Sequence, residues 1–187
     1  MKRYTTTLCA LLLVGSSTLY ADQLKTSDTT PVLRHVQGMK SVGLQGGKTS
    51  LGGEMMLVGD YYFSPQWKVS VGLGKEADKW GEHRYQSFFL QPLAGYTLYA
   101  HPKYFVLRVL GGAKLSLDSL QTKKQMRQGD ARSYTGSIGL VGGGEVECFV
   151  TKRISVVLSG GLRRFLWSSP DLSKNDYFLH LGFRFSL

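Results

Sequence analysis

The C-terminal residues of the chain alternate between apolar and polar side chains. From Tyr177 to Leu187 every odd position is apolar, and the even positions are polar or glycine except for Phe178. Successive side chains of a β-strand point to opposite faces. The pattern therefore predicts a strand with one face against an apolar medium and the other against polar groups.

The same alternation returns from Lys40 onward and predicts seven further strands. Their approximate ranges are 40–47, 53–63, 67–76, 84–99, 104–117, 134–150 and 154–167. Pro92 falls inside the fourth range, where it cannot donate a ladder hydrogen bond, so we expect a bulge or local distortion there. Eight strands is an even number, as bacterial single-chain membrane barrels require.

The predicted connections differ in length according to their order. The second, fourth and sixth are short turns, at about 64–66, 100–103 and 151–153, whereas the third, fifth and seventh are longer, at 77–83, 118–133 and 168–176. The first connection, 48–52, is expected on the same side as the long ones, but it is short. A soluble β-sandwich has no reason to sort its loops in this way. The sequence therefore predicts an all-β fold, an eight-stranded antiparallel up-and-down transmembrane β-barrel of the outer membrane, over residues 40–187.

Aromatic residues lie near the ends of the predicted strands, as in the interfacial girdles of membrane barrels. The residues assigned to these girdles are Tyr61, Tyr62, Phe63, Trp67, Tyr96, Tyr99, Tyr104, Phe105, Phe149, Phe165 and Trp167. The last strand also resembles the C-terminal assembly signal of outer-membrane barrels. That resemblance is carried by His180, Gly182, Phe185 and Leu187.

The N-terminus has the features of an export signal. Lys2 and Arg3 precede a short apolar stretch and then small and polar residues, which predicts a cleaved signal peptide over residues 1–21. Residues 22–39 lack a sustained period and are interpreted as a periplasmic lead-in. We therefore expect the protein to be exported to the outer membrane of a Gram-negative bacterium. Cys148 is then the single cysteine of the mature chain, which excludes an internal disulfide.

Charged residues recur on the polar face of the predicted strands. They are Glu54, Asp60, Lys68, Arg108, Lys114, Glu145, Glu147, Arg163 and Arg184. The interior of an eight-stranded barrel is barely wider than its own side chains. We therefore expect these charges to pair in a network that fills the lumen, in preference to a channel or a proton relay.

The sequence offers little for catalysis. Its four histidines do not share metal-ligand spacing, so we predict neither a metal nor another cofactor. His180 and Ser186 share the polar face and keep open the alternative of a lipid-modifying enzyme, although we expect no enzymatic activity. The glycine runs lack the strand–helix context of a phosphate loop and indicate bends in tightly coiled strands.

The chain is basic, with a formal net charge of +10. Four basic residues fall in the fifth predicted connection: Lys123, Lys124, Arg127 and Arg132. An exterior basic loop could contact nucleic acid, but contact with outer-membrane lipid, through the phosphates of lipopolysaccharide, is the simpler interpretation. We expect no direct nucleic-acid contact.

The second half of the chain resembles the TraO family of conjugal transfer proteins, which are carried on conjugative transposons. The resemblance lies in Gly142–Ile154, in Arg163–Ser168 and in His180–Phe185, and more loosely in Gly59–Phe63 and Gln91–Tyr96. It implies a non-enzymatic outer-membrane component of the mating apparatus of a type IV-like secretion system, with other conjugative transfer proteins as partners. The alternative is a general outer-membrane binding or adhesion barrel unrelated to conjugation.

Overall fold

A computed structural model describes residues 37–80, 83–101, 103–122, 134–168 and 174–187. All of them belong to a single unit. The predicted signal peptide and nearly all of the predicted lead-in lie outside these residues. Among the residues described, no helix is long and apolar enough to span a membrane.

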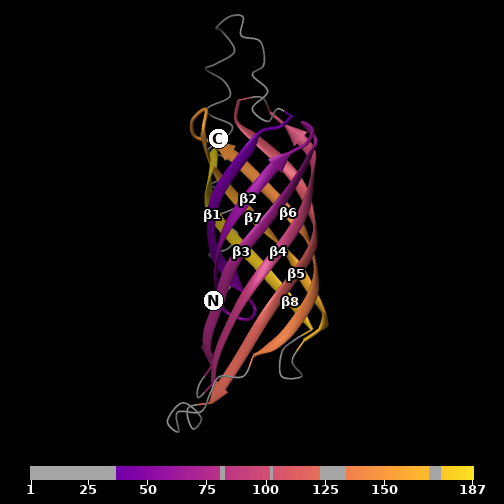
Figure 1. The fold of residues 1–187 in the computed structure, drawn as a ribbon. Helices are drawn as coiled ribbons and strands as arrows, with labels where there is room; N and C mark the ends of the chain where they lie inside the picture. Colours follow the sequence, from indigo (N-terminus) through magenta and orange to yellow (C-terminus); the bar gives the residue numbers. More distant parts are fainter. Residues whose placement is uncertain (1–36, 81–82, 102, 123–133, 169–173) are drawn as a thin grey trace, which may run out of the picture. The chain divides into compact units, whose positions relative to one another are not determined.

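The described residues form a closed antiparallel barrel in which each strand pairs with the next along the chain and β8 pairs with β1 (Figure 1). This confirms the predicted fold class. The strands are β1 Lys40–Thr49, β2 Gly53–Tyr62, β3 Trp67–Trp80, β4 His83–Ala100, β5 Phe105–Thr122, β6 Thr135–Phe149, β7 Ile154–Trp167 and β8 Asn175–Ser186.

The alternation of the sequence decides which side of the wall each side chain takes. In β8 the apolar Leu181 and Phe183 are 57% and 62% exposed on the outside, whereas Arg184 between Phe183 and Phe185 is 1% exposed on the inside. The outer face is thus a continuous apolar surface, and the inner face is mostly polar. This is the distribution expected of a barrel surrounded by lipid.

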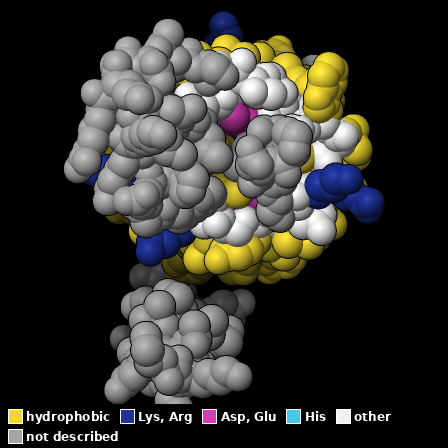
Figure 2. Space-filling model, turned by 90° about the horizontal axis from the view of Figure 1, so that it is seen from below, with side chains coloured by type: hydrophobic (Ala, Val, Ile, Leu, Met, Phe, Trp, Pro, Cys, Tyr) yellow, Lys and Arg dark blue, Asp and Glu magenta, His cyan; other side chains and the backbone are white. Residues whose placement is uncertain are grey.

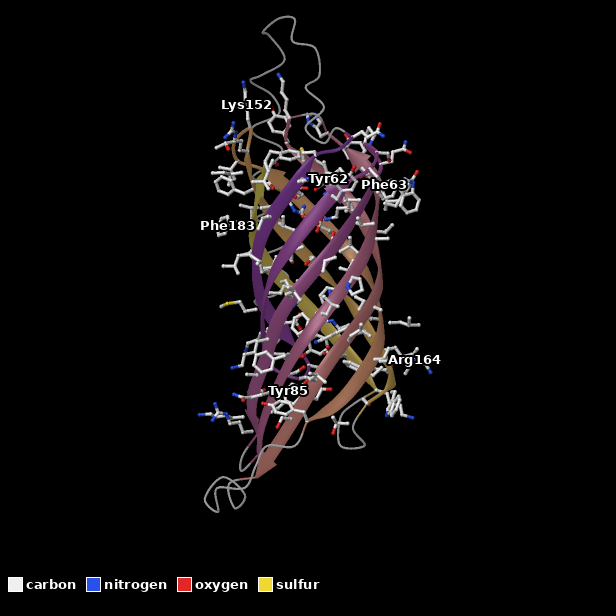
Figure 3. The ribbon with its side chains drawn as sticks, in the orientation of Figure 1. Tyr62, Phe63, Tyr85, Lys152, Arg164 and Phe183 are labelled. Atoms are coloured by element: carbon white, nitrogen blue, oxygen red, sulfur yellow. The ribbon has the colours of Figure 1, made fainter. Side chains whose placement is uncertain are left out.

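The two ends of the barrel differ. At the end that we call the turn end, the connections 63–66, 101–104 and 150–153 are four residues each, and β1 begins and β8 ends there. The opposite, loop end carries the connections 50–52, 81–82, 123–134 and 168–174. Tyr62 marks the turn end and Tyr85 the loop end (Figure 3).

The predicted short turns are present, but the predicted long connection at 77–83 is wrong. Backbone pairing continues through Ala77–Gln86 to Trp80–His83, which leaves only residues 81–82 between β3 and β4. The apolar alternation stops near Glu76, whereas the ladder continues because backbone groups can pair beyond the apolar band. β5 likewise extends to Thr122, beyond its predicted end.

The expected distortion at Pro92 does not change the register. Leu90 pairs with Leu115 and Leu93 with Gly112, so the β4–β5 register is the same on both sides of Pro92. The register shift lies further along, between Thr97 and Tyr99. The carbonyl oxygen of Pro92 approaches Gly112 so closely that a Cβ atom there would lie 2.2 Å from it.

Most of the predicted girdle aromatics lie on the outer face, and those near the turn end contact one another. The ring centroids of Phe63 and Trp67 are 6.4 Å apart, and those of Trp67 and Tyr96 are 4.9 Å apart. Two assignments were wrong. Tyr62 and Phe165 are 1% and 5% exposed because they occupy inward positions of their strands.

Candidate functional site

The inward charges near the turn end form one network, which we call the turn-end network. Its members are Asp60, Lys68, Arg108, Glu145, Glu147 and Arg184. Glu145 is at its centre: one carboxylate accepts from Lys68 at 2.8 Å, from Arg184 at 2.9 Å and from Arg108 at 3.0 Å. Three carboxylates thus face three cations.

The remaining acceptors of the turn-end network are also occupied. Glu147 lies 2.6 Å from Arg108 and 2.8 Å from Arg184, and it accepts a hydrogen bond from Ser155 at 2.5 Å. Asp60 lies 2.8 Å from Arg184 and accepts from the hydroxyl of Ser70. Buried ions stay charged at tolerable cost only when they are paired and hydrogen-bonded in this way.

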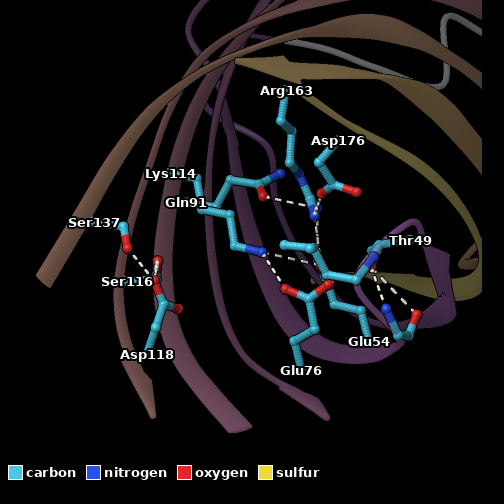
Figure 4. Close-up of polar contacts among 12 residues, drawn as sticks. Thr49, Glu54, Glu76, Gln91, Lys114, Ser116, Asp118, Ser137, Arg163 and Asp176 are labelled. Carbon is cyan, nitrogen blue, oxygen red and sulfur yellow. Dashed lines mark hydrogen bonds and ion pairs between the residues drawn. The ribbon is translucent and has the colours of Figure 1, made fainter. Parts of the chain in front are cut away.

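A second group of charges, the loop-end network, lies toward the other end. Its members are Glu54, Glu76, Lys114, Arg163, Asp176 and His180. Arg163 makes a two-pronged contact with Glu54, at 2.6 and 2.7 Å, and lies 3.2 Å from Asp176. Lys114 bridges Glu54 and Glu76 at 3.3 and 2.8 Å (Figure 4).

Acidic groups outnumber basic ones toward the loop end. Glu54, Glu76 and Asp176 face two formal cations, and Asp118 adds a carboxylate that accepts from the hydroxyls of Tyr85, Ser116 and Ser137. Acidic side chains are visible in the centre of this end, inside an apolar perimeter from which Lys and Arg project (Figure 2).

Apolar and aromatic side chains fill the interior beside the charges. Phe178, the one exception to the alternation of the last strand, stacks on His180 with ring centroids 5.1 Å apart and lies 4.6 Å from the guanidinium carbon of Arg163. The amine of Lys114 lies 4.3 Å from the ring centroid of Phe89. Aromatic faces attract cations, so these rings stabilise the buried charges that they cover.

The described residues leave little space inside the barrel. Leu51, Tyr85 and Phe165 form an apolar cluster at the loop end, and Met56, Val58 and Phe89 form another. A void between the two networks, lined by Glu145 and Gln91 among others, has a volume of about 20 Å³. That is room for about one water molecule. The described lumen is therefore a packed core.

All nine charged residues predicted for the lumen lie on the inner face, but they form two networks instead of one. Three further carboxylates on the inner face, Glu76, Asp118 and Asp176, were not predicted, because each lies beyond or at the edge of the apolar alternation that defined the strands. The inward apolar residues were not predicted either, because an apolar side chain is compatible with either face of the wall.

The residues of the predicted assembly signal do not all face the same way. Phe185 and Leu187 are 51% and 78% exposed on the outer face. His180 is buried inside, with Nε2 3.4 Å from Glu54. Gly182 faces inward where a Cβ atom would lie 2.2 Å from the carbonyl oxygen of Leu44, so the close contact with β1 requires glycine.

The fold does not bring together the two residues that the sequence suggested for a lipid-modifying enzyme. His180 and Ser186 are six residues apart on one strand, which separates them by about 20 Å. No group of three His, Cys, Asp or Glu residues in the described ranges is arranged to hold a metal ion. Cys148 is a free thiol on the outer face. The basic residues Lys123, Lys124, Arg127 and Arg132 lie outside the described residues.

Neither a family model nor a curated protein matches this sequence. Solved structures do. The N-terminal β-barrel domain of Pseudomonas aeruginosa OprF is 13% identical, with a TM-score of 0.63, over 81% of this chain and 98% of that one. Neisserial surface protein A is 14% identical, with a TM-score of 0.61, over 80% of this chain and 95% of that one.

A major outer membrane protein from Thermus thermophilus is 13% identical, with a TM-score of 0.60, over 80% of this chain and 98% of that one. The fold is that of an outer-membrane β-barrel. At such low identity these similarities show the fold alone, so the function must be argued from the site.

Proposed function

We propose that this chain is a structural, non-enzymatic outer-membrane barrel that supports conjugative DNA transfer. It acts through protein contacts at its ends, with other transfer proteins as partners, and through neither a channel nor a reaction in its interior. The observation that carries the proposal is the packed, charge-paired lumen. Because the described interior is filled, we infer that the outer surface and the two ends of the barrel bind its partners.

Several of the residues that resemble the TraO family belong to the two charge networks of the interior. Glu145 and Glu147 anchor the turn-end network, Arg163 anchors the loop-end network, and Arg184 belongs to the former. The resemblance therefore lies largely in the residues that hold the interior together. It supports a shared barrel architecture, and the link to conjugation rests on the resemblance itself.

The experiment that tests the proposal is a mating assay with a donor that lacks this gene. Transfer should collapse and return when the full chain is restored in the outer membrane. A variant in which residues 123–133 are replaced by a two-residue Gly-Ser turn leaves β5 and β6 intact. If transfer fails with this variant while it still fractionates with the outer membrane, the long connection is a contact surface.

Unchanged transfer from the deletion donor would refute the conjugative role. The fold would stand, and the general binding or adhesion barrel would become the better account. The lipid-modifying alternative has its own test in the double variant His180→Ala/Ser186→Ala. A loss of outer-membrane lipid modification in that variant, with the barrel still assembled, would contradict the non-enzymatic proposal.

A further inference from the structure

Asp118 differs from the other buried carboxylates of the barrel. It is 4% exposed and lies on the inner face of β5, near the loop end. Every other buried Asp or Glu of the described residues lies within 3.2 Å of a Lys or Arg nitrogen. The partners that the described residues give Asp118 are hydroxyl groups. A buried carboxylate without a counter-charge is costly, so this position favours the binding of a cation.

Four hydroxyl groups from three strands lie beside Asp118. The hydroxyl of Tyr85 donates to Oδ1 at 3.2 Å, that of Ser116 donates to Oδ2 at 3.3 Å, and that of Ser137 also donates to Oδ2 (Figure 4). The fourth hydroxyl belongs to Ser87 on β4, which pairs directly with Asp118 on β5 and therefore shares its face. The five side chains supply two carboxylate oxygens and four hydroxyl oxygens.

The hydroxyl of Ser87 is unsatisfied. Ser87 is 0% exposed, and its Oγ makes no hydrogen bond within the described part of the chain. Ser87 pairs with Glu76 on one side and with Asp118 on the other, so it lies between two carboxylates on the inner face. Buried hydroxyl groups nearly always have a partner. An unsatisfied oxygen between two carboxylates is placed to bind a cation.

The charge of the loop end indicates the valence of that cation. Its buried carboxylates are Glu54, Glu76, Asp118 and Asp176, and its buried cations are Lys114 and Arg163. With His180 neutral, four negative charges face two positive ones, whereas the turn-end network is neutral. One divalent cation would bring the loop end to the same neutrality. Acidic side chains are visible in the centre of this end (Figure 2).

Calcium is the divalent cation that fits these donors. Oxygen ligands suit the hard cations Ca²⁺ and Mg²⁺, whereas zinc and copper prefer imidazole and thiolate. Ca²⁺ accepts six to eight oxygens in a flexible geometry, but Mg²⁺ demands a near-ideal octahedron and keeps several of its waters. The donors here come from three strands and are mostly neutral hydroxyls, which suits the more tolerant ion.

We propose that Asp118, together with the hydroxyls of Tyr85, Ser87, Ser116 and Ser137, binds one calcium ion at the loop end of the barrel. The ion joins β4, β5 and β6 through their inner faces. The set has one carboxylate and four hydroxyls, and so differs from a cluster of three acidic residues, which the described ranges lack. The inference is independent of any role in conjugation, and the lumen stays closed.

The test is equilibrium dialysis of the full folded protein against radioactive calcium in an uncharged detergent, which excludes calcium held by lipid phosphates. The wild type should bind one calcium ion per chain, with a Kd of roughly 0.1–1 mM, as in extracellular sites with few charged ligands. Asp118→Asn removes the charged ligand and should weaken binding about tenfold or more. Heat-modifiable migration checks that the variant is folded.

Ser87→Ala tests the site without a change of charge. It removes one oxygen and should weaken calcium binding several-fold. Ser159→Ala is the matched control, because Ser159 is also buried on the inner face, at 4% exposed, but lies on β7 and donates to Gln45. Its calcium binding should equal that of the wild type.

Three results would overturn the proposal. The first is an absence of saturable binding by the wild type, which would mean that Asp118 is held as the protonated acid. The second is equal binding by Asp118→Asn and the wild type, or by Ser87→Ala and Ser159→Ala. The third is displacement of bound calcium by an equal concentration of magnesium, which would overturn the choice of ion.

Discussion

The turn-end network makes a quantitative prediction about Glu145 and Lys68. Glu145→Gln removes one of three carboxylates and leaves three cations, whereas Lys68→Gln leaves three carboxylates with two cations. Each single change therefore strands one charge in an interior where these side chains are at most 3% exposed. The double variant restores neutrality.

The magnitudes follow from the cost of breaking a buried ion pair. Each single substitution should lower the free energy of unfolding by about 3–5 kcal/mol, because the partner charge stays buried without compensation. In the double variant Asp60 keeps Arg184 at 2.8 Å, and Glu147 keeps Arg108 at 2.6 Å. The double variant should therefore be more stable than the sum of the single effects predicts, by about 2 kcal/mol or more.

The assay is urea unfolding of the barrel in lipid vesicles, followed by tryptophan fluorescence. Trp67 and Trp167 are 43% and 70% exposed on the outer face at opposite ends, so both report the loss of lipid contact. Single effects below about 1 kcal/mol, or a double variant whose loss equals the sum of the two, would refute the view that these charges form one neutral buried unit.

Three further predictions concern the wall. Phe185→Asp/Leu187→Asp should abolish heat-modifiable, membrane-assembled protein, because both side chains face lipid; normal assembly would contradict the orientation of β8. Leu158→Arg should lower the free energy of unfolding in vesicles by about 2–4 kcal/mol, whereas Val150→Arg near the turn end should lower it by about 0–1 kcal/mol. Equal costs would mean that the assigned depths are wrong. Gly161→Ala should lower the free energy of unfolding by about 1–3 kcal/mol, since its Cβ atom would lie 2.2 Å from the carbonyl oxygen of Gly142. Gly142→Ala is the control, because a Cβ atom there would meet open space. A neutral Gly161→Ala in the same unfolding assay would contradict this close approach.

Much of the fold can be predicted from the sequence because one physical rule, the period of two, applies along each strand. It yields the eight strands and the correct face for residues such as Leu181 and Arg184. The rule fails where an apolar side chain occupies an inward position of its strand. Tyr62 and Phe165 are aromatic, lie near strand ends and fit a girdle by composition, yet the register turns both inward.

The interior was less predictable because partners in a barrel are brought together across the lumen. Arg163 and Glu54 are 109 residues apart in the chain, and no local pattern indicates that they meet. The division into two networks depends on how far each strand extends. Glu76 and Asp176 were missed for that reason, since Glu76 lies where the apolar alternation of β3 ends and Asp176 lies just before that of β8 begins.

Ion conductance of the full folded protein in a planar lipid bilayer is the most direct test of the packed lumen. Because the interior is filled, we expect no stepwise current at moderate voltage, for the wild type and for the neutral double variant Glu145→Gln/Lys68→Gln alike. Reproducible single-channel steps from the wild-type protein would contradict the packed lumen. They would show an open path through the interior and would remove the observation on which the proposed function rests.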